Sequence, residues 1–324
     1  MLILMQGLFS WIHLDQIQEG EFGFFFTGYK ACCVLKIYLC LYFVTCRWIY
    51  VSNSEVSDGG VGAIKFNSDG QVINYEMILD GTSQNCGGGK TYWGTWVTCE
   101  ENGSSGQVWE VDPTLDASSQ RNRPTVLGGS GGNYESFAYD ARDRLNPTFY
   151  VTNDSSSGGL VRFTPDPTVV ANAEATGDYS RVLTTMGTLE WLVLIPESGS
   201  THASQGTFRW SSSRTEGDSS SNQFYRNSEG IDIRNGLLYF VTKTSKSLYI
   251  LDLDNFTYQR SSTVSGAFDG QPDQVKRIIA EDPKSDMLYF CEEASSDNGI
   301  HARDTEGNFY TIIDSDTLNS ETTG

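Results

Sequence analysis

The chain has 324 residues, and its 41 Asp and Glu residues against 22 Lys and Arg residues give a formal net charge of −19 at pH 7. Because such a charge repels nucleic acids and anionic membrane surfaces, neither is expected as a partner. The acidic residues serve either solubility or the binding of cations. With 33 glycines and 12% aromatic residues, the composition indicates many short strands joined by turns and excludes a disordered chain.

Residues 1–48 differ from the rest of the chain, because they are crowded with Phe, Cys, Leu and Tyr and lack turn residues. The apolar run 33–45 is interrupted by Lys36 and is short for a membrane span. The run 2–12 has neither a basic segment before it nor a small-residue cleavage site after it. Three interpretations stay open: an anchor or signal, an unusual structural segment, or non-native sequence such as translated intron. We therefore separate this segment from a domain at 49–324.

From residue 49 onward one phrase recurs: a short apolar run that ends in Thr, Ser or Cys and is followed by polar or acidic residues. A spacing of about 40–50 residues with several short strands per unit is typical of β-propellers. Six copies predict an all-β, six-bladed β-propeller, and the alternative is an irregular β-sandwich with accidental spacing. The copies centre on Val51, Val97, Val151, Val193, Val241 and Phe290.

The segments between the copies predict the remaining strands of each unit. Runs rich in β-branched and aromatic residues, bounded by Gly, Asn or Asp, predict strands at 61–66, 72–75, 160–163 and 247–253. No stretch after residue 50 has a convincing helical period, so we expect at most a turn or two of helix.

Acidic residues stand at matching places ahead of the phrase. Glu135, Glu229 and Asp273 each precede a short strand by one or two residues. If that strand is the innermost of its blade, the three acids converge on one rim of the axial channel. Three equivalent positions favour a cation site over exposed loop acids. The pairs Glu100-Glu101 and Glu292-Glu293 end their strands and are either solvated turn residues or additional ligands.

The most specific stretch is Asn85–Asn102, in which Cys86 precedes three consecutive glycines. The glycines allow a close approach of the backbone to another group, and their spacing is not that of a phosphate-binding P-loop. The predicted position of Cys86 in a loop suits a thiolate ligand for a soft or trivalent metal. Cys99 and Cys291 fall inside copies of the phrase and are expected in the core. Trp93 and Trp96 are expected to pack between blades.

Asn85–Asn102 resembles the signature N-C-A/G-G-G-x-T-x-W-G-T-W-x-x-C-E-E of the PhoX-type alkaline phosphatase family. Glu135–Asp140, Ser228–Gly230 and Leu288–Glu293 extend the resemblance over most of the chain from about Ile49. The resemblance implies a six-bladed propeller with a mixed centre of Fe3+ and Ca2+ on its axis. It also implies the hydrolysis of phosphate monoesters and an extracellular or secretory-pathway location.

The resemblance carries over to individual residues. Cys86 matches the metal-bound cysteine of the family, and Glu135 and Glu229 match its acidic ligands. Asp273, Glu292 and Glu293 match more loosely as metal ligands.

The chain also departs from the family pattern. The family has an arginine closely before the glutamate matched by Glu229, whereas Asn227 and Ser228 separate Arg226 from it here. Arg226 and Lys90 are the residues expected to bind the remaining phosphate oxygens. The family also continues beyond the Glu-Thr-Thr-Gly sequence at 321–324, so we expect a propeller that is incomplete at the C-terminus.

The sequence therefore predicts a metal-dependent phosphatase that acts on small-molecule phosphate esters. Clustered cations neutralise the phosphate dianion, carboxylates suit calcium and iron, and one thiolate suits iron. Two alternatives stay open: a calcium-stabilised propeller that acts only as a binding module, and a lactonase-like calcium hydrolase, against which the thiolate argues. We expect a monomer, without membrane association unless residues 1–48 are an anchor.

Overall fold

The computed structural model describes residues 48–315 except 121, 201, 279, 281–282 and 295–297. The predicted N-terminal segment, apart from its last residue, and the C-terminal residues 316–324 therefore lie outside the described residues. Within the described part of the chain, no helix has the length and apolar character needed to cross a lipid bilayer.

The described chain consists mainly of short antiparallel strands. The first ten strands are β1 (Trp48–Ser54), β2 (Gly59–Phe66), β3 (Val72–Thr82), β4 (Asn85–Lys90), β5 (Trp96–Glu100), β6 (Val108–Val111), β7 (Arg123–Pro124), β8 (Tyr134–Asp140), β9 (Thr148–Asn153) and β10 (Val161–Thr164). The others are β11 (Thr188–Pro196), β12 (Gln205–Ser211), β13 (Ser228–Arg234), β14 (Leu237–Thr242), β15 (Ser247–Asp252), β16 (Thr257–Ser262), β17 (Gln271–Ile278), β18 (Met287–Glu293), β19 (Asn298–Asp304) and β20 (Phe309–Ser315).

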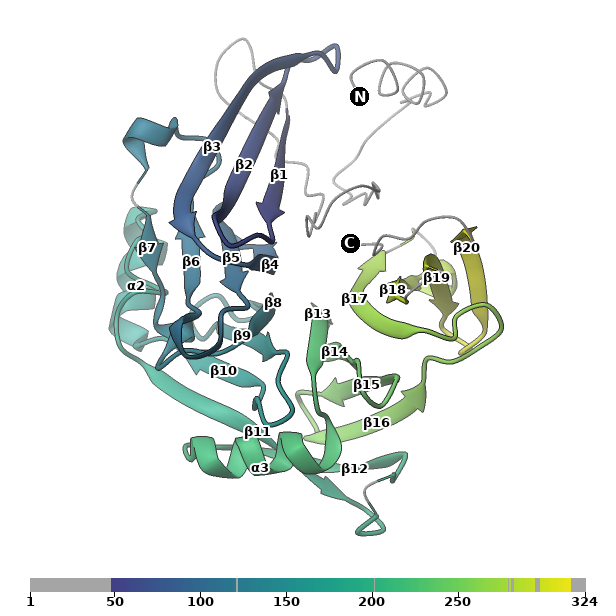
Figure 1. Ribbon diagram of the computed structural model, residues 1–324. Coiled ribbons are helices and arrows are strands. Elements are labelled where there is room, and N and C mark those ends of the chain that lie inside the picture. Colours follow the sequence, from purple (N-terminus) through teal and green to yellow (C-terminus); the bar gives the residue numbers. More distant parts are fainter. Residues whose placement is uncertain are drawn as a thin grey trace.

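The strands form blade-like sheets arranged around a common centre, as Figure 1 shows. Three sheets have the orders β1-β2-β3, β4-β5-β6-β7 and β17-β18-β19-β20. The nine-stranded sheet combines two blades, β8 to β12 and β13 to β16, which join where the outer strands β12 and β16 pair. The inner strands β4, β8, β13 and β17 pack against one another in that order. The fold is therefore all-β and propeller-like.

The described residues form five blade-like units, and the prediction of six blades is not confirmed. The phrase lies on β1, β5, β9, β14 and β18, which take the second position of a blade wherever the inner strand is described. The copy at Val193 instead lies on β11, an outer strand of the blade that begins with β8. An outer strand with one buried face, such as β11 with Leu192 and Leu194 inside, imitates the phrase.

The residues predicted to be buried between strands are in the core. Trp96 is fully buried and packs with Ile49 and Val51 of the neighbouring sheet, so it fills the space between two blades. Trp93 stacks on Tyr179 with 5.1 Å between the ring centroids. Cys99 and Cys291 are also buried, as predicted.

Two helices were not expected from the sequence: α2 (Pro167–Thr176) and α3 (Arg214–Phe224). Both are short, and their sequence signals lie in the caps rather than in a periodic apolar face. Asp166 caps α2 ahead of a proline in its first turn, and Gly177 ends it in the left-handed conformation. The side chain of Ser213 caps α3 by accepting from the Glu216 backbone N–H.

Candidate metal centre

The four inner strands share one irregularity near their starts. In each ladder with the second strand, pairing stops at one residue and resumes three residues later, so two residues oppose one on the partner strand. Such β-bulges redirect side chains and are frequent beside functional sites. The first of the two unpaired residues is Cys86 in β4, Glu135 in β8, Glu229 in β13 and Asp273 in β17. We call these four residues the first ring.

Glycines next to the first ring let the inner strands approach closely. A Cβ atom on Gly87 would lie 2.3 Å from the backbone oxygen of Glu135, and one on Gly89 would lie 2.6 Å from that of Phe137. A Cβ atom on Gly230 would lie 2.4 Å from the backbone nitrogen of Val275. Real Cβ contacts are longer than this, so only glycine fits. The close backbone approach predicted for the consecutive glycines 87–89 is confirmed.

The first ring converges as the sequence predicts. Carboxylate oxygens of Glu135, Glu229 and Asp273 lie within 4.8 Å of one another, and all three residues are buried. The Cys86 thiol donates to Glu135 Oε1 at 2.9 Å, and Gln274 Nε2 donates to the same oxygen at 2.7 Å. The thiol and the three carboxylates therefore form one continuous cluster.

A second ring lies at the ends of the second strands. Its members are the last residue of the strand or the next one: Glu55, Glu101, Asp154, Lys243 and Glu293. Ligand atoms of Glu55, Cys86 and Glu101 lie within 4.8 Å of one another, so the two rings meet at the thiol. Of its acids, Glu293 was among the predicted ligands and Glu101 was left open as one, whereas Glu55 and Asp154 were not predicted, although the phrase places an acid there in four of its copies.

Lys243 brings a positive charge to this cluster. Its Nζ lies 2.8 Å from Glu293 Oε2, 3.1 Å from Glu229 Oε1 and 3.3 Å from Asp154 Oδ2. Asn227, held in the left-handed region at φ 53°, donates from Nδ2 to Asp154 Oδ1 at 2.7 Å and so orients that acid. The sequence signal for Lys243 was its place in the phrase, where four of the other copies carry acids.

Burial and like charge perturb the acids of the two rings. Burial raises the pKa of Glu135 and of Glu229 well above the ordinary value, and neighbouring acids raise both further. Burial and the charges of Asp154 and Glu55 raise the pKa of Glu101 to about 7. Burial alone would lower the pKa of Lys243, but the surrounding carboxylates outweigh it and raise that pKa.

The donors in this cluster do not match its acceptors. Glu229 Oε2 receives no hydrogen bond from the described residues, and the contact of Glu229 Oε1 with Lys243 is an ion pair without hydrogen-bond geometry. A buried carboxylate without donors is costly. Oxygen ligands in this number suit Ca2+, and a thiolate beside them suits iron, so the donor set fits a group of cations.

The structure does not bring Glu292 to the cluster. Its Oε1 accepts from the backbone N–H groups of Asp269 and Gly270, and its Oε2 lies 2.9 Å from His301 Nε2. Glu100 has the equivalent role in its own blade, where it accepts from the backbone of Ser83 and Gln107. The first glutamate of each Glu-Glu pair therefore accepts hydrogen bonds from backbone N–H groups, whereas the second glutamate belongs to the second ring.

Nor does the structure place the two predicted phosphate-binding residues at the cluster. Arg226 is exposed, and its guanidinium donates back to the backbone and side-chain oxygens of Asn222 in α3, both at 2.5 Å. Lys90 ends β4, four residues beyond Cys86, which corresponds to about 13 Å along a strand.

The family model described as alkaline phosphatase PhoX matches residues 58–247, more than half of the chain. This chain belongs to the PhoX family. Membership confirms the resemblance seen in the sequence and indicates a phosphatase-type hydrolase with metal-dependent catalysis.

One solved structure agrees with this family at the level of the fold. Pseudomonas fluorescens PhoX in complex with vanadate, a transition state analogue, is 14% identical, with a TM-score of 0.60 over 87% of this chain and 77% of that chain. A putative 6-phosphogluconolactonase from Bacteroides uniformis is 13% identical, with a TM-score of 0.43 over 83% of this chain and 68% of that chain. No curated protein matches this chain significantly.

Proposed function

We propose that this chain is a phosphatase that hydrolyses phosphate monoesters at an iron–calcium centre held by the first ring. The observation that carries the proposal is the set of four equivalent bulges, which bring one thiol and three carboxylates together in a member of the PhoX family. The related Pseudomonas protein binds vanadate, a transition state analogue, which supports a phosphoryl substrate here.

The donor chemistry assigns different ligands to the two metals: iron would take ligands from both rings, and calcium would take ligands from the first ring. Cys86, with Glu55 and Glu101 beside it, would hold iron, because a thiolate is a soft ligand. Glu135, Glu229 and Asp273 present oxygen ligands that suit calcium. When bound, these cations supply the positive charge that offsets the substrate dianion.

Residues of the chain itself prepare the site for that charge. Glu135 is fixed in orientation by the two hydrogen bonds that it accepts from Cys86 and Gln274. Lys243 is fixed by three carboxylates, yet 23% of its side chain stays exposed. Once bound cations offset these carboxylates, the ammonium group would attract a phosphate anion that the net charge of −19 would otherwise repel.

The proposal includes the expectations that follow from the family. The propeller has six blades, of which the described residues form five. The protein is exported and acts as a monomer on small phosphate esters. Light scattering on the purified protein tests the monomer, and a dimer would remove that part of the proposal.

Elemental analysis of the purified protein, combined with hydrolysis of 4-nitrophenyl phosphate, tests the function. We expect iron and calcium together, and hydrolysis that a chelator abolishes and the two metals restore. Calcium alone without hydrolysis would instead indicate a binding module and contradict the proposal. A protein that hydrolyses the ester equally well after complete metal removal would also contradict it.

A further inference from the structure

The backbone of the bulge at Cys86 is bonded by a side chain from the neighbouring blade. Cys86 and Gly87 are the two residues of β4 without a partner on β5, because the ladder passes from Asn85 to Gly88. Backbone groups of a buried bulge need hydrogen bonds from outside the ladder. Asn53 of β1 supplies them: its Nδ2 donates to the backbone oxygen of Cys86 at 2.6 Å and to that of Gly87 at 2.8 Å.

The whole amide of Asn53 takes part in this arrangement. The residue is 1% exposed, and its Oδ1 accepts from Trp96 Nε1 at 2.9 Å. An asparagine amide has two N–H donors and one oxygen acceptor, so both donors are used and the oxygen is bonded. A reversed amide would place its oxygen against two carbonyl oxygens and its N–H groups against the indole N–H. The surrounding groups therefore admit one orientation of the amide.

The bulge is also confined on its other side, by β8. A Cβ atom on Gly87 would lie 2.3 Å from the backbone oxygen of Glu135, so the two strands are in direct contact there. The Cys86 thiol donates to Glu135 Oε1 at 2.9 Å. Glu55, two residues beyond Asn53, brings a carboxylate oxygen within 4.8 Å of the same thiol. The position of the thiol therefore depends on contacts from both neighbouring blades.

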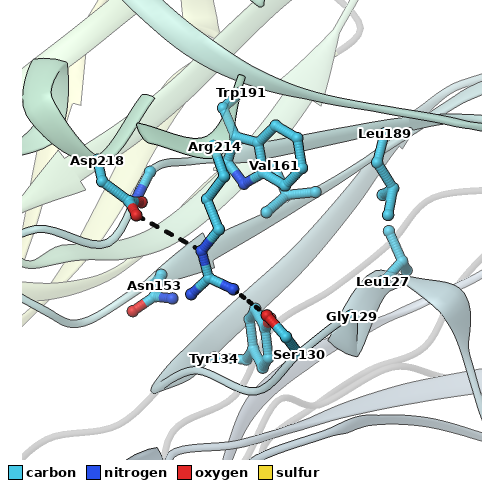
Figure 2. A pocket seen from close by; sticks show the side chains of 11 residues that line it. Leu127, Gly129, Ser130, Tyr134, Asn153, Val161, Leu189, Trp191, Arg214 and Asp218 are labelled. Carbon is cyan, nitrogen blue, oxygen red and sulfur yellow. Dashed lines mark hydrogen bonds and ion pairs between the residues drawn. The ribbon is translucent and has the colours of Figure 1, made fainter. Parts of the chain in front are cut away.

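A second buried asparagine near the rings has different surroundings. Asn153 ends β9 directly before Asp154 and is 4% exposed. Its side chain lines a separate cavity, which Figure 2 shows together with Tyr134 and Arg214. Its Oδ1 receives no hydrogen bond from the described residues. Asn153 therefore offers a matched control for a substitution at Asn53.

We propose that Asn53 is a positioning residue of the metal centre, which fixes the Cys86 thiol where the two rings meet. The inference rests on the proposed function, because a fixed thiol serves catalysis only as a ligand of iron. Groups that orient a metal ligand without binding the metal typically contribute about 10–100-fold to metal affinity. Because Asn53 acts through the backbone of Cys86 and Gly87, its loss should weaken iron binding more than calcium binding.

The thiol of the metal-free protein reports on this role directly. Alkylation by iodoacetamide, followed by peptide mass spectrometry, measures Cys86 separately from the other cysteines. Asn53→Leu keeps the approximate size of the side chain and removes its three hydrogen bonds, so the released bulge should raise the alkylation rate at least about fivefold. Asn153→Leu should keep the rate within twofold of wild type. An unchanged rate in Asn53→Leu, or an equal rise in both variants, would overturn the proposal.

Titration with ferric iron tests the consequence for the metal, through the absorption band of thiolate-to-iron charge transfer. Asn53→Leu should shift this band and lower the iron affinity about tenfold, whereas the calcium affinity, measured by calorimetry, should stay within twofold of wild type. Equal losses of iron and calcium would indicate a merely structural role and refute the proposal.

A milder variant and the metal-free measurement keep the test decisive. If Asn53→Leu does not fold, Trp96→Phe keeps an aromatic ring and removes the N–H that orients the amide, and it should weaken iron binding about threefold. Wild-type iron affinity in Trp96→Phe would then contradict the proposal. If wild type binds no iron while Asn53→Leu still raises the alkylation rate, the proposed function fails and the positioning of the thiol is supported.

Discussion

Adjacent glutamates in two blades show how this fold separates structural acids from site acids. Glu100 and Glu292 are buried and accept hydrogen bonds from backbone N–H groups near the turns that lead into β4 and β17. Glu101 and Glu293 follow them directly and belong to the second ring, where Glu293 pairs with Lys243. The structural acids are therefore buried and accept from backbone N–H groups, whereas the site acids that follow them are only partly buried and lie among other charged side chains.

Charge matching extends this difference between the axis and the rest of the molecule. Away from the axis, two buried acids pair with cations of their own: Glu110 with Arg123 at 3.1 Å, and Asp286 with Arg277 at 2.7 Å. At the axis, three buried acids of the first ring lie near one lysine. A bound cation removes that imbalance, and a structural role for the same acids does not.

The largest effect is expected for Glu229→Gln, which keeps the size of the side chain and removes a charge of the first ring. Because metal affinity depends on that charge, we expect loss of bound calcium and at least about a 100-fold fall in 4-nitrophenyl phosphate hydrolysis. The matched control is Glu292→Gln, which should keep metal content and activity while lowering the unfolding free energy by about 2 kcal/mol. Equal metal content in Glu229→Gln and wild type would argue against a ligand role.

The next largest effect is expected for Lys243→Met in the metal-free protein. Removal of this cation leaves several carboxylates unpaired, so we expect a loss of about 3 kcal/mol in unfolding free energy, measured with denaturant and chelator. Added calcium should restore most of that loss, because the ion replaces the missing charge. Lys65→Met, whose partner Asp116 has a side chain that is 68% exposed, is the control and should change stability little. If added calcium restores none of the lost stability, the ammonium group of Lys243 does not replace a bound metal ion in the metal-free protein.

These two predictions concern Glu229, which the sequence predicted as a site residue, and Lys243, which it did not. The three acids of the first ring were predictable because each stands at the start of a repeated strand. The prediction that Cys86 lies in a loop was wrong, because Cys86 and the three glycines after it form most of β4, where glycines give no strand signal. Lys243 was not predicted as a site residue, because only acidic residues were considered as ligands at the end of the phrase. The phosphate-binding role of Arg226 stays a prediction, and the guanidinium, which follows α3 closely, donates to Asn222.

Cys86→Ser should have a smaller and more selective effect. Serine keeps a hydrogen-bond donor to Glu135 but is a poor ligand for iron at neutral pH, so the iron content should fall while calcium remains. We expect about a tenfold fall in hydrolysis, with a calcium-to-protein ratio equal to wild type. Cys99→Ala, in the core of the same blade, serves as the control and should keep its iron. Full iron content in the serine variant would assign the metal to other ligands.

The smallest effect is a pH dependence of the metal-free protein. The pKa of Glu101 is about 7 in the folded state, against an ordinary value of 4.5. The folded state therefore binds more protons than the unfolded state between these values, and stability falls as pH rises from about 4.5 to 7. We expect a loss of about 1–2 kcal/mol across this range in chelator, which Glu101→Gln reduces. A stability that rises over the same range in both proteins would contradict the sign.

Anomalous diffraction from crystals of the purified protein tests the central claim most directly. Data collected on both sides of the iron absorption edge should show an iron peak bonded to Cys86 Sγ and calcium density among Glu135, Glu229 and Asp273. The account is contradicted if the first ring contains no metal density, or if the metals lie only beside acids that are already paired, such as Glu292.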